Sequence, residues 1–210
     1  MKLYDAPWAP SPRRVRIFLA EKGIDVPREA IDLRTGEHLA DAYLRINPRG
    51  AVPALEFDDG EVLCESAAIC RYFEALHPQP SLFGATPIDI GRIESWTRRI
   101  EGDGYAACVY VLRNTAPAFK DRAIPDAGLS VAQIPELAAR GAQMWESFTE
   151  ALDRRLGASA WIAGPNYSFA DITALVTIDF ARAAKLAVPE RLVHLGRWHA
   201  EASARPSASA

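Results

Sequence analysis

The stretch LRINPRGAVPALEFDDGEVLCES, residues 44–66, constrains the fold more than any other part of the chain. An apolar run follows Val52-Pro53, the triplet Asp-Asp-Gly at 58–60 turns the chain, and a second run returns through 61–63. This pattern predicts a β-hairpin. Proline has no N–H to give to a sheet, and a cis Val52-Pro53 bond would suit such a turn. A cis bond would also leave the backbone N–H and C=O of Val52 facing outward, where a bound peptide could pair with them.

A second constraint follows the hairpin, because Glu65-Ser66 stands where another helix is expected to begin. A carboxylate, a hydroxyl and unpaired backbone N–H groups meet at such a helix start. The same position holds an anion or a ligand carboxylate well.

The first part of the chain alternates strand and helix patterns. Ser11-Pro12 predicts the N-cap and first position of a helix that ends at Gly23 in a left-handed cap. The other expected elements are strands at 2–4 and 28–33, a helix at 37–46 and a helix at 66–76. Together with the hairpin they predict a four-stranded sheet with a parallel crossover.

The composition changes after His77, where HPQPSLFGATP carries prolines and small residues without periodicity. We therefore expect a domain at 1–77, a linker at 78–87 and an all-helical domain at 88–210. The helical domain should contain helices at 88–113, 135–156 and 172–186, the first weakened or kinked at Gly102 and Gly104. Ser168 and Asp171 form a capping-box pattern before the third helix. The end, EASARPSASA, reads as a frayed tail.

Composition excludes several classes of function. The chain has 210 residues, is 49% hydrophobic and carries a net charge of −3, which gives no reason to expect nucleic acid as a partner. No apolar run approaches the ~18 residues that span a bilayer, and a secretory signal is not evident, so we expect a cytoplasmic protein that binds no membrane. Cys64, Cys70 and Cys108 lack the spacing of a metal site, which predicts reduced, mostly buried thiols and no metal.

Taken together, RVRIFLAEKGI, INPRGAVPALE, the Glu65-Ser66 pair and the later capping box resemble the cytosolic glutathione transferases over nearly the whole chain. The resemblance implies an α/β thioredoxin-like N-terminal domain, an all-α C-terminal domain and a homodimer. It also implies glutathione as a co-substrate, bound on the first domain.

By position, Val52 is similar to the residue whose backbone pairs with the cysteinyl unit of glutathione, and Pro53 to the family's cis-proline. Glu65 and Ser66 are similar to the pair that holds the γ-glutamyl amine and carboxylate. His38 lies where many members hold the glycine carboxylate. From the residues alone, His38 could equally be a solvated side chain and Ser66 a plain N-cap.

The group that favours the glutathione thiolate is an open choice. A hydroxyl at a helix start would stabilise the thiolate, and Ser11 is the hydroxyl nearest the first helix. The segment YDAPWAPSPRRVRIFLAEKGI also resembles an atypical fungal and bacterial group that lacks the usual Tyr, Ser or Cys. In that group a water held by the second domain acts, for which Asp103, Tyr105 and Asn114 are the candidates here. Ser11 would then only cap its helix.

The second substrate is expected to be a small apolar electrophile. The aromatic candidates for its site are Trp8, Tyr105, Tyr110 and Phe119. The leading hypothesis is a glutathione transferase. A thiol or dehydroascorbate-type reductase is the weaker alternative, because the loop before the first helix has no cysteine. A third hypothesis is a non-catalytic glutathione- or ligand-binding protein of the same fold.

Overall fold

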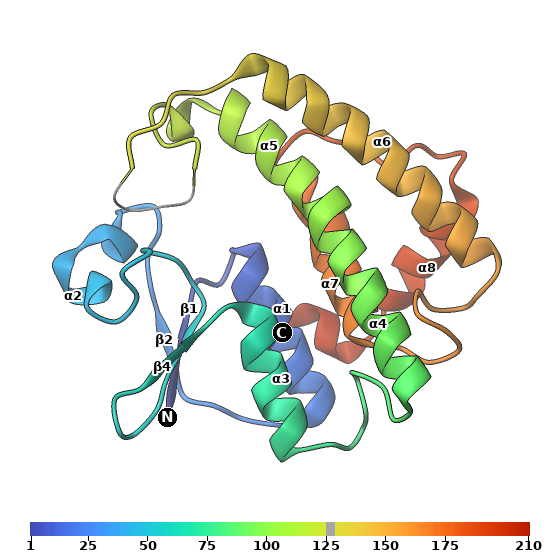
Figure 1. Ribbon diagram of the computed structural model, residues 1–210, viewed down its shortest axis with the longest axis horizontal. Helices are drawn as coiled ribbons and strands as arrows, with labels where there is room; N and C mark the ends of the chain where they lie inside the picture. Colours follow the sequence, from blue (N-terminus) through green and yellow to red (C-terminus); the bar gives the residue numbers. More distant parts are fainter. Residues whose placement is uncertain (125–128) are drawn as a thin grey trace. The chain divides into compact units, whose positions relative to one another are not determined.

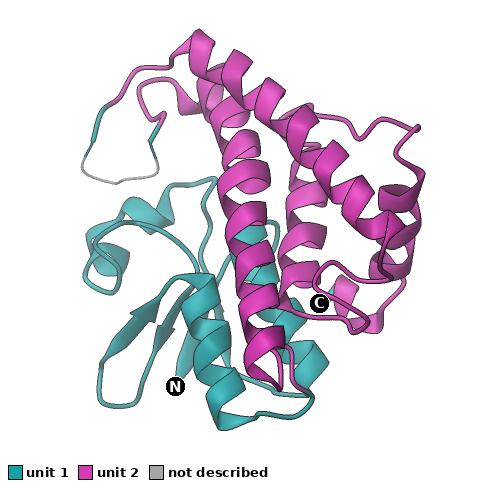
Figure 2. Cartoon of the chain, turned by 45° about the vertical axis from the view of Figure 1, so that its right-hand side comes forward, with its two compact units in different colours: residues 1–80, 124–130, 210 teal, residues 81–123, 131–209 magenta. Residues whose placement is uncertain are grey.

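The computed structural model describes residues 1–124 and 129–210 and divides into two compact units. The first is formed mainly by Met1–Pro80, and the second by Ser81–Ala123 and Val131–Ser209 (Figure 2). Each unit has its own buried core and is described by itself below.

The first unit is a four-stranded sheet with helices packed on it (Figure 1). Its strand order is β2-β1-β3-β4, with β1 parallel to β2 and antiparallel to β3. The elements in chain order are β1 (Lys2–Asp5), α1 (Pro10–Lys22), β2 (Arg28–Ala30), η1 (Glu37–Leu39), α2 (Asp41–Leu44), β3 (Ala54–Glu56), β4 (Val62–Cys64) and α3 (Ser66–Leu76). The expected crossover, hairpin and final helix are confirmed.

Both faces of this sheet are covered, because successive side chains of a strand point to opposite sides. Tyr4 and Ala54 belong to a buried cluster with Tyr43 of α2. Leu3 and Leu55 are fully buried and lie on the other face, where α1 and α3 pack side by side (Figure 1).

Two element boundaries in this unit, the start of α1 and the end of β2, differ from the sequence prediction. Helix α1 begins at Pro10 with Ala9 as N-cap, so Ser11 is its second residue and not its cap. Proline suits a first helical position at either site, and Pro10 takes it here. Strand β2 ends at Ala30 because Asp32 starts a turn, its Oδ1 accepting from the Arg34 amide at 2.8 Å.

The predicted helix at 37–46 is also wrong in detail. A 3₁₀ turn covers 37–39, Ala40 is extended, and the short α2 follows. The break accompanies the burial of Tyr43, so tertiary packing overrides the local helical pattern here.

The second unit is helical. Its elements are α4 (Pro87–Arg99), the π-helical turn η2 (Ile100–Tyr105), α5 (Ala106–Thr115), η3 (Pro117–Phe119), α6 (Pro135–Gly157), α7 (Phe169–Phe180), α8 (Val193–Ser203) and η4 (Pro206–Ser209). The first predicted helix is thus one helical run with a π turn at its glycines. Gly104 permits close approach, since a Cβ there would lie 2.5 Å from the Phe148 ring.

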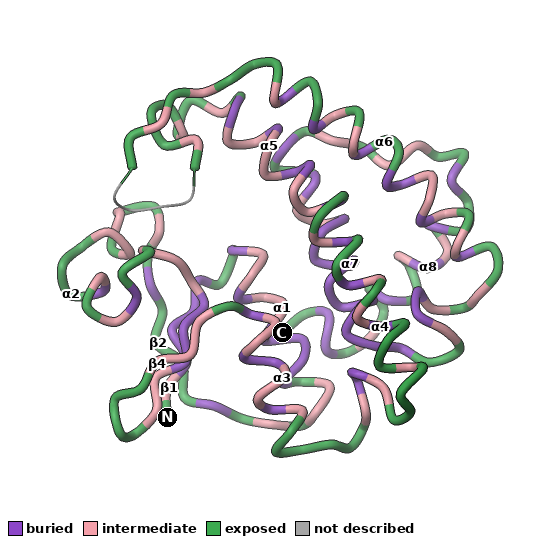
Figure 3. The backbone as a smooth tube through the Cα atoms, viewed as in Figure 1, coloured by how far each residue is buried: buried purple, intermediate pink, exposed green. Residues whose placement is uncertain are grey.

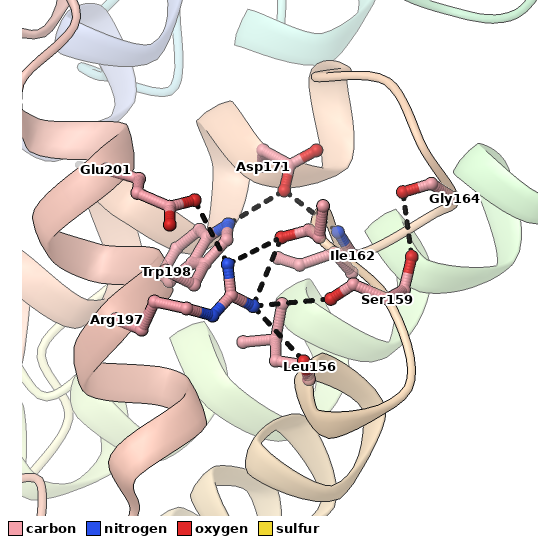
Figure 4. Close-up of polar contacts among 9 residues, drawn as sticks. Leu156, Ser159, Ile162, Gly164, Asp171, Arg197, Trp198 and Glu201 are labelled. Atoms are coloured by element: carbon pink, nitrogen blue, oxygen red, sulfur yellow. Dashed lines mark hydrogen bonds and ion pairs between the residues drawn. The ribbon is translucent and has the colours of Figure 1, made fainter.

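Helix α7 is the buried centre of this unit, with residues 169–178 all buried (Figure 3). Its predicted capping box is confirmed, and the Asp171 carboxylate does more than cap (Figure 4). One oxygen accepts from the Ser168 amide at 3.0 Å, and the other accepts from the Ile162 amide at 3.0 Å and from Trp198 Nε1 at 2.8 Å. Asp171 therefore ties together α7, α8 and the loop after α6.

Two segments without periodicity are more ordered than the sequence indicates. In the predicted linker, Leu82 and Phe83 are buried, and Phe83 stacks on Phe169 with ring centroids 4.4 Å apart. The predicted frayed tail forms η4, where Ser207 and Ala208 are buried. Within the part of the chain that the structure describes, no helix combines the length and apolarity needed to cross a membrane.

Candidate functional site

The loop before β3 offers an unpaired piece of backbone. The Val52-Pro53 bond is cis, as predicted, and Pro53 is buried. Among residues 1–124 and 129–210, no hydrogen bond is made by the amide or carbonyl of Val52. Buried or half-buried backbone groups normally have partners, so this pair is open to a strand-like ligand.

Two buried side chains hold this loop in place. Tyr43 Oη and Asn47 Nδ2 each donate to the Ala51 carbonyl at 2.7 Å. Asn47 Oδ1 also accepts from the Arg49 amide at 3.1 Å. Asn47 directly follows the predicted helix at 37–46, and its position four residues before Ala51 is a signal for a side-chain-supported turn.

Glu65 and Ser66 stand at the start of α3 in contrasting environments. Glu65 has a φ of 70°, a strained value for a residue with a Cβ, and its side chain is 70% exposed. Ser66 is 2% exposed. Strained non-glycine residues concentrate at ligand sites, and here the strain presents a carboxylate to solvent beside a buried hydroxyl.

Two arginines connect this helix start to the rest of the site. Arg14 of α1 donates to Ser66 Oγ from Nε at 3.0 Å and from Nη2 at 2.5 Å. Arg49 Nη1 lies 2.9 Å from Glu65 Oε1. Arg14 of α1, the loop at 49–53 and the start of α3 therefore form one cluster. Sequence reasoning missed both arginines, since nothing in their local pattern marks them.

The remaining predicted residues of the first unit lie around this framework. Ser11 is half-buried in the first turn of α1, and His38 is half-buried on η1. Trp8 is 55% exposed, with the Arg34 guanidinium 5.5 Å from its ring centroid. Cys64 is half-buried, and burial followed by the charge of Glu65 raises the pKa of its thiol, so it is not a ready nucleophile.

The aromatic candidates of the second unit lie on η2, α5 and η3. Tyr105 stacks on Phe180 with ring centroids 5.3 Å apart. The Arg113 guanidinium lies 4.7 Å from the centroid of Phe119. Tyr110 is half-buried on α5, and its carbonyl accepts from Asn114 Nδ2 at 2.8 Å.

Asn114 is committed to structure, because its Oδ1 also accepts from the Ile134 amide at 2.8 Å. Both ends of its amide side chain are engaged. It is a poor candidate for holding a reactive water, whereas Asp103 is exposed on η2.

Comparison with known proteins finds two domain models of one family in this chain. Residues 8–76 match the glutathione S-transferase N-terminal domain, and residues 143–206 match the C-terminal domain. Glutathione S-transferase 2 of Saccharomyces cerevisiae is 35% identical over 99% of this chain and 87% of its own. The chain belongs to the glutathione S-transferase family. Its fold, a thioredoxin-like sheet unit and a helical unit, is the fold of these enzymes.

Solved structures of glutathione S-transferases are similar over the whole chain. The crystal structure of Gtt2 from Saccharomyces cerevisiae has a TM-score of 0.88 at 33% identity, covering 99% of this chain and 98% of that one. A glutathione S-transferase domain-containing protein from Marinobacter aquaeolei has a TM-score of 0.86 at 33% identity, covering 99% of both chains.

The two matched domain spans include some of the candidate residues and leave others out. The N-terminal match spans His38, Val52, Pro53, Glu65 and Ser66. Tyr105, Tyr110 and Phe119 lie outside both matched spans. What those aromatic residues do must therefore be argued from their own surroundings. In the part of the chain that the structure describes, no group of three or more His, Cys, Asp or Glu residues is placed to hold a metal ion.

Proposed function

We propose that this glutathione S-transferase binds glutathione on its first unit and conjugates the thiolate to small, largely apolar electrophiles. The observation that carries the proposal is the open backbone of Val52 before a cis-proline. An extended cysteinyl unit would pair with that N–H and C=O as an added strand does.

The charged groups of glutathione suit the rest of the cluster: an amine and a carboxylate at the γ-glutamyl end, and a carboxylate at the glycine end. The exposed Glu65 carboxylate would take the γ-glutamyl amine, and the Ser66 hydroxyl with the amides of the α3 N-terminus would take its carboxylate. His38 on η1 would reach the glycine carboxylate. Arg14 and Arg49 join this assignment as residues that hold Ser66 and Glu65.

Chemistry then requires the thiolate, because a free thiol titrates near ~8.5 and the thiolate is the nucleophile. Its sulfur forms a bond to the electrophilic carbon, and the leaving group departs with the bonding electron pair. The proton of the thiol is lost to solvent on ionisation. The hydroxyl of Ser11, in the first turn of α1, would donate a hydrogen bond to the sulfur, and the helix N-terminus would add a positive potential.

Activation by a water held on the helical unit is the alternative, as in the atypical group that this sequence resembles. Asp103 and Tyr105 are the residues left for that role, because the amide of Asn114 is engaged elsewhere. Trp8, Tyr105, Tyr110 and Phe119 remain the proposed electrophile residues. We also propose a cytoplasmic homodimer.

An ultraviolet difference titration with glutathione from about pH 5 to 9 tests the function. We expect a thiolate band with an apparent pKa well below ~8.5. Binding without ionisation would favour a non-catalytic binding protein, and no binding would overturn the proposal. A thiol reductase is disfavoured, because burial raises the pKa of Cys70 and Cys108 as well as that of Cys64.

Ser11→Ala separates the two modes of activation. If Ser11 donates to the sulfur, the variant should raise the pKa of the bound thiol and lower kcat by ten- to a hundredfold. Its thermal unfolding should change little, because Ser11 is not the helix cap. Unchanged kcat and thiol pKa would assign activation to the helical unit.

A further inference from the structure

Arg113 occupies an unusual place among the aromatic residues of the helical unit. It lies in the last turn of α5 and is half-buried. Its Nη1 donates to the Arg122 carbonyl at 2.9 Å, and its guanidinium lies over the Phe119 ring. Burial lowers the pKa of Arg113, and the phenol of Tyr105 opposes this in part. Arg113 therefore contacts one proposed electrophile residue, Phe119, and lies within electrostatic range of a second, Tyr105.

A comparison with Arg16 shows what Arg113 lacks. Burial lowers the pKa of both guanidinium groups. Arg16 is compensated by Asp5, whose Oδ1 lies 2.6 Å from Arg16 Nη1. Among the described residues no carboxylate pairs with Arg113, and the charge of Arg122 lowers its pKa further. Partly buried cations are normally paired, so within the residues that the structure describes the charge of Arg113 is not offset by an anion.

The backbone beneath Arg113 is fixed on both sides. Gln133 Nε2 donates to the carbonyl of Arg113 at 2.9 Å and to that of Ala116 at 2.8 Å. Neighbouring Asn114 bonds both its own helix and the amide of Ile134. These bonds fix the backbone that carries Arg113, while the Arg122 carbonyl and the Phe119 ring hold the guanidinium itself. A cation held in this way suits preorganised recognition of an anion.

We propose that Arg113 is an anion-recognition group of the electrophile site, and that the preferred electrophiles carry a carboxylate on an aromatic or similarly flat apolar body. A planar guanidinium donates two parallel N–H bonds to a carboxylate. Phe119, and Tyr105 stacked on Phe180, supply apolar surface beside it. The assignment rests on the proposed transferase function and narrows its substrate class.

Binding of two unreactive probes tests the anion site without requiring turnover. In the presence of glutathione, calorimetry with 3,5-dinitrobenzoate and with 1,3-dinitrobenzene compares a carboxylate ligand with its neutral counterpart. We expect tighter binding of the benzoate, and Arg113→Gln should weaken it at least tenfold while changing dinitrobenzene binding less than twofold. Arg113→Lys should restore part of the loss, because it keeps the charge but not the fork.

Arg92→Gln is the matched control, since Arg92 is an exposed arginine of α4 and its loss changes the net charge equally. If Arg92→Gln weakens benzoate binding as much as Arg113→Gln does, the effect comes from the net charge of the protein and the proposal fails. Equal loss for both probes in Arg113→Gln would also overturn it. Thermal unfolding of each variant separates lost binding from lost folding.

Turnover then distinguishes failure of this inference from failure of the transferase function. Conjugation of 1-chloro-2,4-dinitrobenzene and 4-chloro-3,5-dinitrobenzoate is followed as chloride leaves and the thioether forms. Arg113→Gln should lower kcat/KM at least tenfold for the benzoate only, mainly through KM. Selective benzoate binding with neither compound turned over would keep the anion site and reject the transferase. Turnover of both, equally in the variant, would keep the transferase and reject the anion site.

Discussion

At the scale of single residues, Ser66 shows how a neighbouring side chain determines whether a hydroxyl donates or accepts a hydrogen bond to the ligand. Two N–H groups of Arg14 point at Ser66 Oγ and occupy its acceptor capacity. The hydroxyl hydrogen must then seek an acceptor elsewhere, and the γ-glutamyl carboxylate of glutathione is the acceptor that we propose. Arg14 is thus a positioning residue whose charge also favours that carboxylate.

Ser66→Ala should therefore raise the KM for glutathione by roughly ten- to a hundredfold, since a hydrogen bond to a charged group contributes about 1.5–3 kcal/mol. Ser168→Ala is the matched control, because Ser168 also begins a helix but lies in the second unit. It should lower stability with an unchanged KM. Equal KM in wild type and Ser66→Ala, measured by initial rates, would contradict the assignment.

The sequence could indicate Glu65, Ser66 and the cis-proline because each sits in a local pattern of turn and helix start. It could not indicate Arg14 or Arg49. Arg14 is far from Ser66 in sequence and meets it only when α1 packs beside α3. Such a pairing depends on tertiary structure, which no local periodicity encodes.

At the scale of elements, the run from α4 through η2 to α5 shows the same limit. Glycines in the predicted helix indicated a weak point, and the structure places a π turn there. Why Gly104 is required follows only from Phe148 of α6, whose ring fills the space a methyl group would need. Gly102 meets no such neighbour.

Gly104→Ala and Gly102→Ala form a matched pair on one turn. Overpacking against Phe148 should lower the free energy of unfolding of the Gly104 variant by about 1–3 kcal/mol. The Gly102 variant should be neutral or gain up to about 1 kcal/mol from helix propensity. Denaturant titrations measure the free energy of unfolding of both variants. Similar values would show that the Phe148 side chain can shift to accommodate the added methyl group at little cost.

The Asp171 network gives the helical unit a pH dependence. Burial raises the pKa of Asp171 from 3.8 to about 6, against the lowering effect of its hydrogen-bond donors. The folded state therefore holds this proton more tightly than the unfolded chain. The stabilisation is fully present below about pH 4 and is lost as the pH rises through about 6.

Asp171→Asn cannot titrate, so it isolates this effect. The free energy of unfolding of the wild type minus that of the variant should fall by about 2.4 kcal/mol between pH 4 and 7. One pKa unit corresponds to about 1.4 kcal/mol, and about a fifth of the full effect is already lost at pH 4, where the unfolded carboxyl is partly ionised. Urea titrations at half-unit pH steps measure the difference. A difference that stays constant or rises with pH would show that the donors hold Asp171 ionised throughout.

At the scale of the whole molecule, the two classes of domain were predictable because strand and helix patterns alternate up to residue 77 and only helical patterns follow. That the linker and the C-terminal segment are folded and partly buried was not predictable. Phe83 and Ala208 are buried although their surroundings are rich in proline, serine and alanine. Phe83, for example, is stacked on Phe169 of α7, and the local composition cannot indicate such a distant neighbour.

The proposed homodimer is the last prediction, and it concerns apolar side chains left on the surface. Ile88 and Ile90 at the start of α4 are 60% and 42% exposed. Covering such side chains contributes about 25 cal/mol per Å² of apolar area, so a partner chain would gain by packing there. Light scattering after size exclusion should give twice the mass of one chain.

Ile88→Arg should then shift the protein toward the mass of one chain, because an unpaired charge is costly to bury in an interface. We propose that the dimer faces are α3 and the run α4–η2–α5. Val193→Arg is the matched control, since Val193 is 63% exposed but lies on α8, outside these faces. It should leave the mass doubled. A wild-type protein with the mass of one chain would refute the dimer. A doubled mass in both variants would show that Ile88 lies outside the interface, because an arginine buried in the interface would weaken association.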